Sequence, residues 1–346
     1  MKNSMFKIVI SVALSAAVVL GLGTSPANAV GPDAGLYGTT DPTYTGVSDQ
    51  SLAILGLVSV GVEPSAAAIN WLVSQQCLDG SYQAYRVSIR TACGPSDPIN
   101  YSGPDSNSTA LAALALNSVG KLSQAKKAAT WLTQAGAKAP NGTTGIAYYP
   151  SVGALPDTNS SALAYAAMTG LGVDSAIVDQ VRTYLLAAIT PCAQSGGAKY
   201  QGTDSGVNNS ASAQALFGLE ALTPAEPANK LAANPKCGKN KVTNLASYLS
   251  GQLKTGLLSS FPYDGTDFGN TAATVVSFNT MEIGKSSVSK AIAALKQNTK
   301  SWALKDGKVN AGALGWLLMS AQATDSNPKK FGGVNLVSTL TSSIKK

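Results

Sequence analysis

The sequence contains no histidine, and this absence restricts the chemistry that the protein can perform. Histidine is the usual general base for a serine or cysteine nucleophile and the commonest proton shuttle near neutral pH. It also belongs to many zinc sites, and the cysteines of this chain form no C-x-x-C pair that could replace it. We therefore predict no metal site and no bound cofactor, and we expect any acid–base chemistry to rely on carboxylates.

Charged residues are also scarce, at 12% of the chain, although the formal net charge is +7. The lysines are scattered along the sequence and form no dense basic run. Proteins that bind nucleic acids usually concentrate their positive charge in one patch or stripe. We therefore expect no nucleic-acid partner, and we interpret the lysines as part of a solvated outer face.

Long apolar runs are missing beyond the first 29 residues. Residues 1–29 combine a basic start, an apolar stretch from Ile8 to Leu22 and the small-residue site Ala27-Asn28-Ala29, which is the pattern of a secretory signal peptide. No later segment offers the ~18 apolar residues that a membrane-spanning helix needs. The sequence predicts a secreted protein that is cleaved after Ala29 and has no membrane span.

Four cysteines in an exported chain indicate two disulfides, for which three pairings are possible. Proximity in the sequence favours Cys77 with Cys93 and Cys192 with Cys237. Each bridge would close a long connection between helices, and such a bridge typically stabilises a fold by roughly 2 to 4 kcal/mol.

A helix-start signature recurs along the chain at a spacing that accommodates two helices. Its copies begin at Asn107, Asn159, Asn209, Asn270 and Asn310, with a looser copy at Gln50. Each copy opens an apolar helix that the asparagine can cap, and an amphipathic helix follows. We predict an N-terminal extension at residues 30–47 and an all-α repeat domain at residues 48–346.

Such helix pairs must stack so that the apolar helices are covered on both sides, either in an open solenoid or in a closed double ring. About six copies and many small residues in the first helices favour the closed ring. One further motif has a familiar form, because Gln76-Cys77-Leu78-Asp79-Gly80-Ser81-Tyr82 resembles the Q-x-x-x-G-x-W repeat of squalene cyclases. Tyr82 replaces the tryptophan of that repeat.

With its recurring helix starts, most of the chain from 48 to 340 resembles the prenyltransferase and squalene-cyclase repeat superfamily. This resemblance implies an α/α toroid with an inner and an outer ring of helices. The acid motif D-x-D-D of the cyclases is absent, and Asp264 and Asp267 have the wrong spacing for it. The zinc set of protein prenyltransferases needs histidine, and no cysteine here begins the Cys-Gly-Glu-Gln motif of thioester domains. The resemblance therefore supports a fold and assigns no activity.

Acidic and aromatic residues gather just ahead of the predicted inner helices, at the end of the ring where members of the superfamily place their reactive groups. The candidate ligand-binding residues are Tyr82, Asp105, Tyr148, Tyr149, Asp157, Tyr200, Tyr263, Asp264 and Asp267. Aspartate in this position is also favoured as a helix cap, and loop tyrosines can equally plug the end of a ring.

Three functions fit these residues. The first is a secreted, non-catalytic binding protein that holds a small molecule or glycan at the mouth of the ring. The second is an extracellular lyase or hydrolase that uses Asp and Tyr. The third is a structural or surface-interaction protein without a small ligand. Because every familiar catalytic set fails at named positions, we favour binding. The sequence assigns no oligomeric state.

Overall fold

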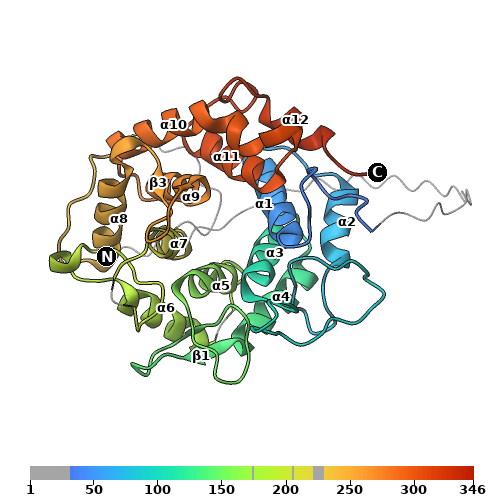
Figure 1. Ribbon diagram of the computed structural model, residues 1–346, viewed down its shortest axis with the longest axis horizontal. Helices are drawn as coiled ribbons and strands as arrows, with labels where there is room; N and C mark the ends of the chain where they lie inside the picture. Colours follow the sequence, from blue (N-terminus) through green and yellow to red (C-terminus); the bar gives the residue numbers. More distant parts are fainter. Residues whose placement is uncertain (1–31, 174, 205, 221–229) are drawn as a thin grey trace, which may run out of the picture. The chain divides into compact units, whose positions relative to one another are not determined.

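The computed structural model describes residues 32–173, 175–204, 206–220 and 230–346, and these form twelve α-helices that alternate between two concentric positions (Figure 1). The predicted signal peptide at residues 1–29 lies outside the described residues. The inner helices are α1 (Gly46–Ser59), α3 (Ser106–Ser118), α5 (Thr158–Gly170), α7 (Asn209–Glu220), α9 (Phe268–Thr280) and α11 (Ala311–Ala323). The outer helices are α2 (Ala66–Ser74), α4 (Leu122–Gln134), α6 (Ala176–Ala188), α8 (Lys241–Gln252), α10 (Lys285–Ala303) and α12 (Leu336–Ser342).

The inner helices form a closed ring. Each packs against the next along the chain, and α11 packs against α1, so that the two ends of the repeat meet (Figure 1). The outer helices lie against the inner ones, as α4 does against α3 and α5, and α10 against α9 and α11. The prediction of an all-α, α/α toroid with six helix pairs is confirmed, and the alternative of an open solenoid is wrong.

The two helix classes differ in how much of their surface is buried. The inner helix α5 buries nine of its residues on several faces, among them Ala162, Leu163 and Met168. The outer helix α4 buries only Ala125, Ala128, Ala129 and Leu132, while its lysines are exposed. Burial of one stripe in the outer helices and of most sides in the inner ones follows from their hydrophobic patterns. None of the described helices combines the length and apolar character that crossing a bilayer requires.

The inner helices begin earlier than the recurring asparagine indicated. Asp105 caps α3, since its carboxylate accepts from the backbone N–H of Ser108 at 2.7 Å, and Asn107 lies inside the helix. Asp157 caps α5 in the same way at 2.8 Å. The prediction that Asn107 caps the helix is therefore wrong, because an aspartate two residues earlier already occupies the extended backbone position that a cap needs.

The same correction applies to two further copies, where Asn208 caps α7 and Asp267 caps α9. Only Asn310, which caps α11, is a cap that coincides with the start of its predicted copy.

A buried hydroxyl lies four residues after the cap in four of the inner helices. Each accepts a backbone N–H from the connection that leads into its own helix, and the donor–acceptor distances are 2.8 to 2.9 Å. The pairs are Tyr82 N–H with Thr109, Ile146 N–H with Ser161, Ala198 N–H with Ser212 and Leu258 N–H with Thr271. We call these four hydroxyls the latch hydroxyls, since each fixes an incoming connection against the first turn of its inner helix.

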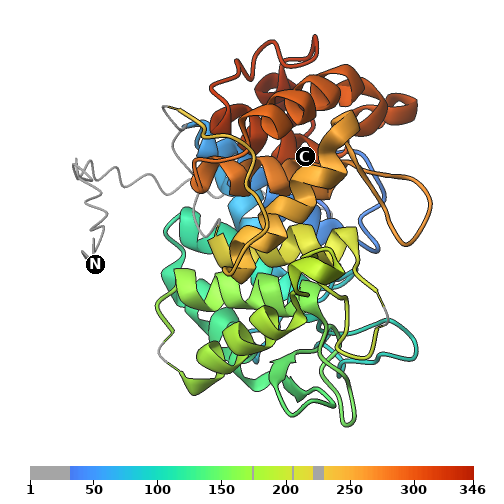
Figure 2. The same ribbon diagram turned by 90° about the vertical axis from the view of Figure 1, so that its left-hand side faces the viewer.

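The connections from outer to inner helices carry the four β-strands of the described residues. Strand β1 (Gly136–Lys138) pairs with β2 (Thr144–Ile146), and β3 (Leu258–Ser259) pairs with β4 (Thr266–Asp267), both antiparallel. The short 3₁₀ helices are η1 (Cys192–Gln194), η2 (Leu253–Thr255) and η3 (Lys305–Gly307). Figure 2 shows that several of these long connections project from the same end of the ring.

Both predicted disulfides are confirmed. Cys77 pairs with Cys93, and Cys192 pairs with Cys237, in each case with Cα atoms 5.8 Å apart. The first bridge closes a loop ahead of α3, and the second joins the connection after α6 to the segment that leads into α8.

Residues 32–45 pack onto the ring and lie beside its C-terminal end. The backbone N–H of Gly35 donates to the carbonyl of Lys345, and the N–H of Lys345 donates to that of Leu36. The ammonium of Lys345 also forms an ion pair with Asp33 at 2.9 Å. The segment predicted as an N-terminal extension is thus fastened to the last residues of the chain.

Candidate functional site

The mouth of the ring is the end at which the inner helices begin. There the carbonyls of Tyr148, Tyr200 and Phe261 accept from the first backbone N–H groups of α3, α5 and α7 respectively. Each of these aromatic residues belongs to the connection that leads into the following inner helix. In these three helices the first N–H is therefore satisfied by the neighbouring repeat, and an aromatic residue is placed beside it.

Two of the candidate acids lie buried beneath this aromatic layer. Asp105 and Asp157 both cap their helices from positions that solvent hardly reaches. Burial raises the pKa of each carboxyl to about 6, although the N–H groups that donate to the carboxyl lower its pKa. Their main role in the structure is to cap α3 and α5, and neither offers an exposed carboxylate to a ligand.

Tyr148 and Tyr149 lie against the first of these acids. Their rings meet edge to face with centroids 4.5 Å apart, and Tyr101 meets Tyr149 in the same manner at 6.4 Å. Burial raises the pKa of both Tyr148 and Tyr149, and the negative charge of Asp105 raises it further. The three rings form one packed cluster, of which Tyr101 is the exposed member, with 77% of its surface accessible.

Tyr200 extends the aromatic layer toward the next repeats. Burial, followed by the charges of Asp157 and Asp204, raises the pKa of its phenol to about 12, and Tyr263 also contributes. Tyr200 is 37% exposed and Tyr263 is 75% exposed. We call Tyr101, Tyr148, Tyr149, Tyr200 and Tyr263, with Asp105 and Asp157 beneath them, the mouth arc.

Two candidate residues do not join this exposed surface as expected. Tyr82 is fully buried, and its phenol oxygen makes no hydrogen bond within the described residues. It lies in the core because its backbone is fixed on both sides, through the N–H to Thr109 and through the carbonyl that accepts from Asp105. Asp264 lies in the exposed turn between β3 and β4 and does not belong to the buried row of acids.

The remaining candidate, Asp267, continues the row of caps. Its carboxylate accepts from the backbone and the side-chain amide of Asn270. The amide of Asn270 also donates to the hydroxyl of Ser210 at 2.8 Å, and Asn159 donates to the same hydroxyl at 3.4 Å. A polar chain therefore runs along the mouth from α9 through α7 to α5.

Several buried oxygens at the mouth have no hydrogen-bond partner among the described residues. They belong to the starts of α3 and α5: Oδ2 of Asp105, Oδ1 of Asn107, Oδ1 of Asn159 and Oγ of Ser160. Unpaired buried polar atoms are uncommon in folded proteins. The sequence analysis interpreted Asn107 and Asn159 as caps, so their place in this polar layer was missed. No three Asp, Glu or Cys side chains within the described ranges converge as a metal site would require.

Comparisons with known proteins address the fold. No protein-family model matches the chain, and no curated protein sequence matches it significantly. Among solved structures, the protein geranylgeranyltransferase-I of Candida albicans in complex with GGPP aligns with 88% of this chain and 93% of its own, at 13% identity and a TM-score of 0.56. A type II terpene cyclase from Scytonema in complex with its substrate, geranylgeranyl dihydroxybenzoate, aligns with 84% of this chain and 92% of its own, at 14% identity and a TM-score of 0.51.

A glycoside hydrolase of family 76, a mannosidase from Bacteroides thetaiotaomicron, aligns with 84% of this chain and 92% of its own, at 11% identity and a TM-score of 0.51. Identities this low carry no activity from one protein to another. The comparisons therefore show that this chain has the α/α toroid fold that terpene cyclases and protein prenyltransferases share.

Proposed function

We propose that the protein is a secreted, non-catalytic binding protein that holds a small molecule or glycan on the mouth arc. The observation that carries this proposal is the gathering of tyrosine side chains from consecutive repeats at one end of the ring, with Tyr101, Tyr200 and Tyr263 exposed. Tyrosine offers an apolar face for the C–H surface of a sugar or a flat ring, and a phenol for its polar groups.

The role of the acids supports binding over catalysis. Asp105 and Asp157 are buried and engaged as caps, so the mouth arc itself presents phenols and few accessible carboxylates. Two of the similar structures are complexes with small molecules, which supports a small ligand for this fold. The two disulfides support export into an oxidising compartment, in keeping with the predicted leader.

One observation favours a second candidate, an extracellular lyase or hydrolase. A carboxyl with a pKa of about 6, such as that of Asp157, is suited to donate a proton near neutral pH, and phenols lie beside it. This function requires the carboxyl to become accessible when a substrate binds. Asp157→Asn separates the two candidates, because it keeps the cap and the binding surface but removes the transferable proton.

The test begins with native mass spectrometry of the mature protein purified from the medium of its own culture, followed by denaturation to identify any released compound. The same protein is then applied to an array of plant and microbial oligosaccharides. We expect a bound compound or a retained glycan, and we expect the double variant Tyr200→Ala/Tyr263→Ala to lose it. Tyr44→Ala is the matched control, since Tyr44 is 83% exposed and lies outside the mouth arc.

Substitution of Tyr149 is avoided in this test because its ring is buried against two others. A wild-type protein that carries no compound and retains no glycan would refute the binding function and favour a structural role. Equal losses in the double variant and in Tyr44→Ala would place the ligand elsewhere on the molecule.

A further inference from the structure

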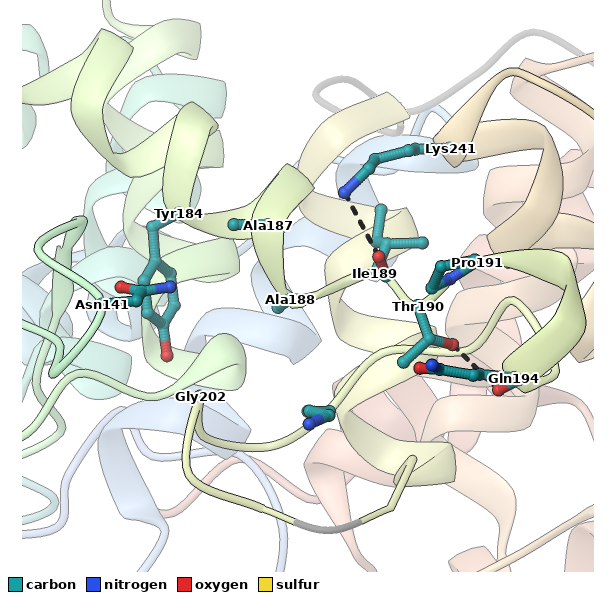
Figure 3. Close-up of a pocket in the computed structure, with 11 residues that line it drawn as sticks. Asn141, Tyr184, Ala187, Ala188, Ile189, Thr190, Pro191, Gln194, Gly202 and Lys241 are labelled. Carbon is teal, nitrogen blue, oxygen red and sulfur yellow. Dashed lines mark hydrogen bonds between the residues drawn. The ribbon is translucent and has the colours of Figure 1, made fainter.

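A pocket of about 260 Å³ lies at the C-terminal end of the outer helix α6, beside the start of α5 (Figure 3). It is bounded by the C-terminal end of α6, the connection that follows it, and the first residue of α8. The polar side chains that line it come from Asn141, Tyr184, Thr190, Gln194, Lys199 and Lys241. None of the exposed tyrosines of the mouth arc lines the pocket, although the lining residue Lys199 directly precedes Tyr200 in the chain.

The pocket has a positive lining. Lys199 and Lys241 both contribute to it, and none of the described residues in the lining is Asp or Glu. Burial, followed by the charges of Asp157 and Asp204, raises the pKa of the Tyr184 phenol, but neither of these carboxylates belongs to the lining. An anionic group that enters the pocket would therefore meet two ammonium groups and no carboxylate of its wall.

The two lysines are held in different ways. The Nζ atom of Lys241 donates to the carbonyls of Leu186 and Ile189 at 2.6 and 3.3 Å, which uses two of its three protons and fixes its position at the end of α6 (Figure 3). The backbone of Lys199 is fixed by its N–H to Ala188 and by its carbonyl, which accepts from Thr158. Its ammonium has no hydrogen-bond or ion-pair partner among the described residues.

The neutral side chains offer both donors and acceptors. The hydroxyl of Tyr184 donates to the carbonyl of Pro156, and that of Thr190 donates within its own loop, so the lone pairs of both oxygens can accept from a ligand. The oxygen of the Asn141 amide accepts from Thr143, which leaves its NH₂ group to donate. Gln194 adds a second amide to the wall.

The disulfide between Cys192 and Cys237 holds one wall of the pocket in place. Cys192 lies between the lining residues Thr190 and Gln194, and Cys237 precedes α8 and Lys241 by a few residues. The carbonyl of Gly238 lies 3.4 Å from the sulfur of Cys192, and its N–H donates to Asn244. The two sides of the pocket are therefore joined covalently, which limits their movement relative to each other.

We propose that this pocket binds a sugar acid of monosaccharide size, with its carboxylate between Lys199 and Lys241 and its hydroxyl groups on Asn141, Tyr184, Thr190 and Gln194. The two ammonium groups select for negative charge, and the mixture of donors and acceptors suits hydroxyl groups. The volume lies just below the range of about 300–1,000 Å³ typical of ligand pockets, which favours a single ring over a polymer segment. This site is independent of the proposed function of the mouth arc.

The test is a titration of the ¹⁵N-labelled protein, with its disulfides intact, with D-glucuronate as the probe, followed by amide chemical shifts. We expect saturable shifts at Thr190, Gln194 and Lys199. D-Glucose supplies the hydroxyls without the charge, acetate supplies the charge without the hydroxyls, and inorganic phosphate tests for a general anion site. Each of the three is expected to bind at least about tenfold more weakly, which is the effect of losing one good polar interaction.

Variants assign the binding to the pocket. Lys199→Met should weaken D-glucuronate about tenfold, and Lys199→Arg should restore most of the affinity because it keeps the charge. Lys239→Met is the matched control, since Lys239 is exposed near the same disulfide and does not line the pocket. Thermal unfolding of each variant shows whether it has folded, and Lys199 is chosen over Lys241 because its ammonium has no structural bonds to lose.

Three outcomes would overturn the proposal. The first is that titration with D-glucuronate leaves the pocket signals unshifted. The second is that D-glucose or phosphate binds as tightly as D-glucuronate. The third is that Lys239→Met weakens binding as much as Lys199→Met. Failure of the mouth-arc experiments would leave this result unaffected, because Tyr200 and Tyr263 do not line the pocket.

Discussion

Gly56 on α1 and Gly315 on α11 face each other where the first and last inner helices meet. A Cβ atom on Gly56 would lie 2.6 Å from the carbonyl oxygen of Gly315, and one on Gly315 would lie 2.2 Å from the carbonyl oxygen of Leu52. These distances are shorter than any normal contact with a carbon atom. The closed ring therefore depends on two glycines that let the backbones of α1 and α11 touch.

Gly315→Ala should destabilise the protein by about 3 kcal/mol, because the added methyl group forces the two backbones apart. The free energy of unfolding in urea measures this loss. Gly251→Ala in α8 is the control, since nothing lies within 4 Å of a Cβ at that position. It should be neutral or stabilise by up to about 1 kcal/mol through its higher helix propensity. Equal effects of the two substitutions would contradict a close-packed seam.

Thr109→Val should cost about 1 to 3 kcal/mol, because it keeps the shape of the side chain but leaves the buried N–H of Tyr82 without an acceptor. Thr133→Val serves as the comparison, since that hydroxyl is exposed and bonds only within its own helix. Urea unfolding again provides the measurement. If both variants were equally stable, the latch hydroxyls would have no special role.

Asp157→Asn should reduce the dependence of stability on pH. The carboxyl has a pKa of about 6 in the folded protein against 3.8 when exposed. Stability from this group is therefore complete below pH 3.8 and is lost as the pH rises through 6, because the folded state must then hold a buried charge. The loss is on the order of a few kcal/mol.

Asparagine caps a helix as well as aspartate does, so the variant should be as stable as the wild type at low pH and more stable at pH 7. Urea titrations at several pH values between 4 and 7 test this expectation. An unchanged slope against pH would mean that Asp157 titrates normally in the folded protein.

Replacing Cys192 and Cys237 by serine should destabilise the protein more than replacing Cys77 and Cys93. The two cysteines are 45 residues apart in the sequence in the first of these bridges and 16 residues apart in the second. In the chain-entropy description, these loops correspond to about 4 and about 3 kcal/mol. Denaturant unfolding of the two double variants gives the comparison, and a reversed order would show that native contacts outweigh loop length.

The repeat in the sequence, together with the resemblance to the squalene-cyclase superfamily, was sufficient to predict the toroid and about six helix pairs. The proximity of the cysteines in the sequence predicted both disulfides. The repeat placed the helix starts too late, because the recurring Asn107 and Asn159 are the second residues of the helices that Asp105 and Asp157 cap. A better signal is an Asp or Asn followed four residues later by Ser or Thr, a spacing that all four caps share with their latch hydroxyls. In three of the four, the hydroxyl also donates to the backbone carbonyl of the cap. The structure explains this spacing, because the hydroxyl accepts a backbone N–H from the connection that leads into the helix.

The surface chemistry was harder to predict. All three of Tyr82, Tyr200 and Tyr263 lie ahead of inner helices, but Tyr82 is buried and the other two are exposed. Only the packing of the folded chain decides which of these side chains points inward. The pocket beside α6 was missed because its lining combines Asn141, the C-terminal end of α6, parts of the connection that follows it, and Lys241. These positions share no motif and are brought together only by the folded chain.

The hydrogen bonds between residues 35–36 and Lys345 have a consequence for the connectivity of the chain. They bring the first and last described residues of the ring together, so the path of the backbone returns to its starting point. A short peptide joining those two ends would leave the packing of every helix unchanged. New termini could then be opened at an exposed loop position such as Val152, and the rearranged chain should fold to the same toroid.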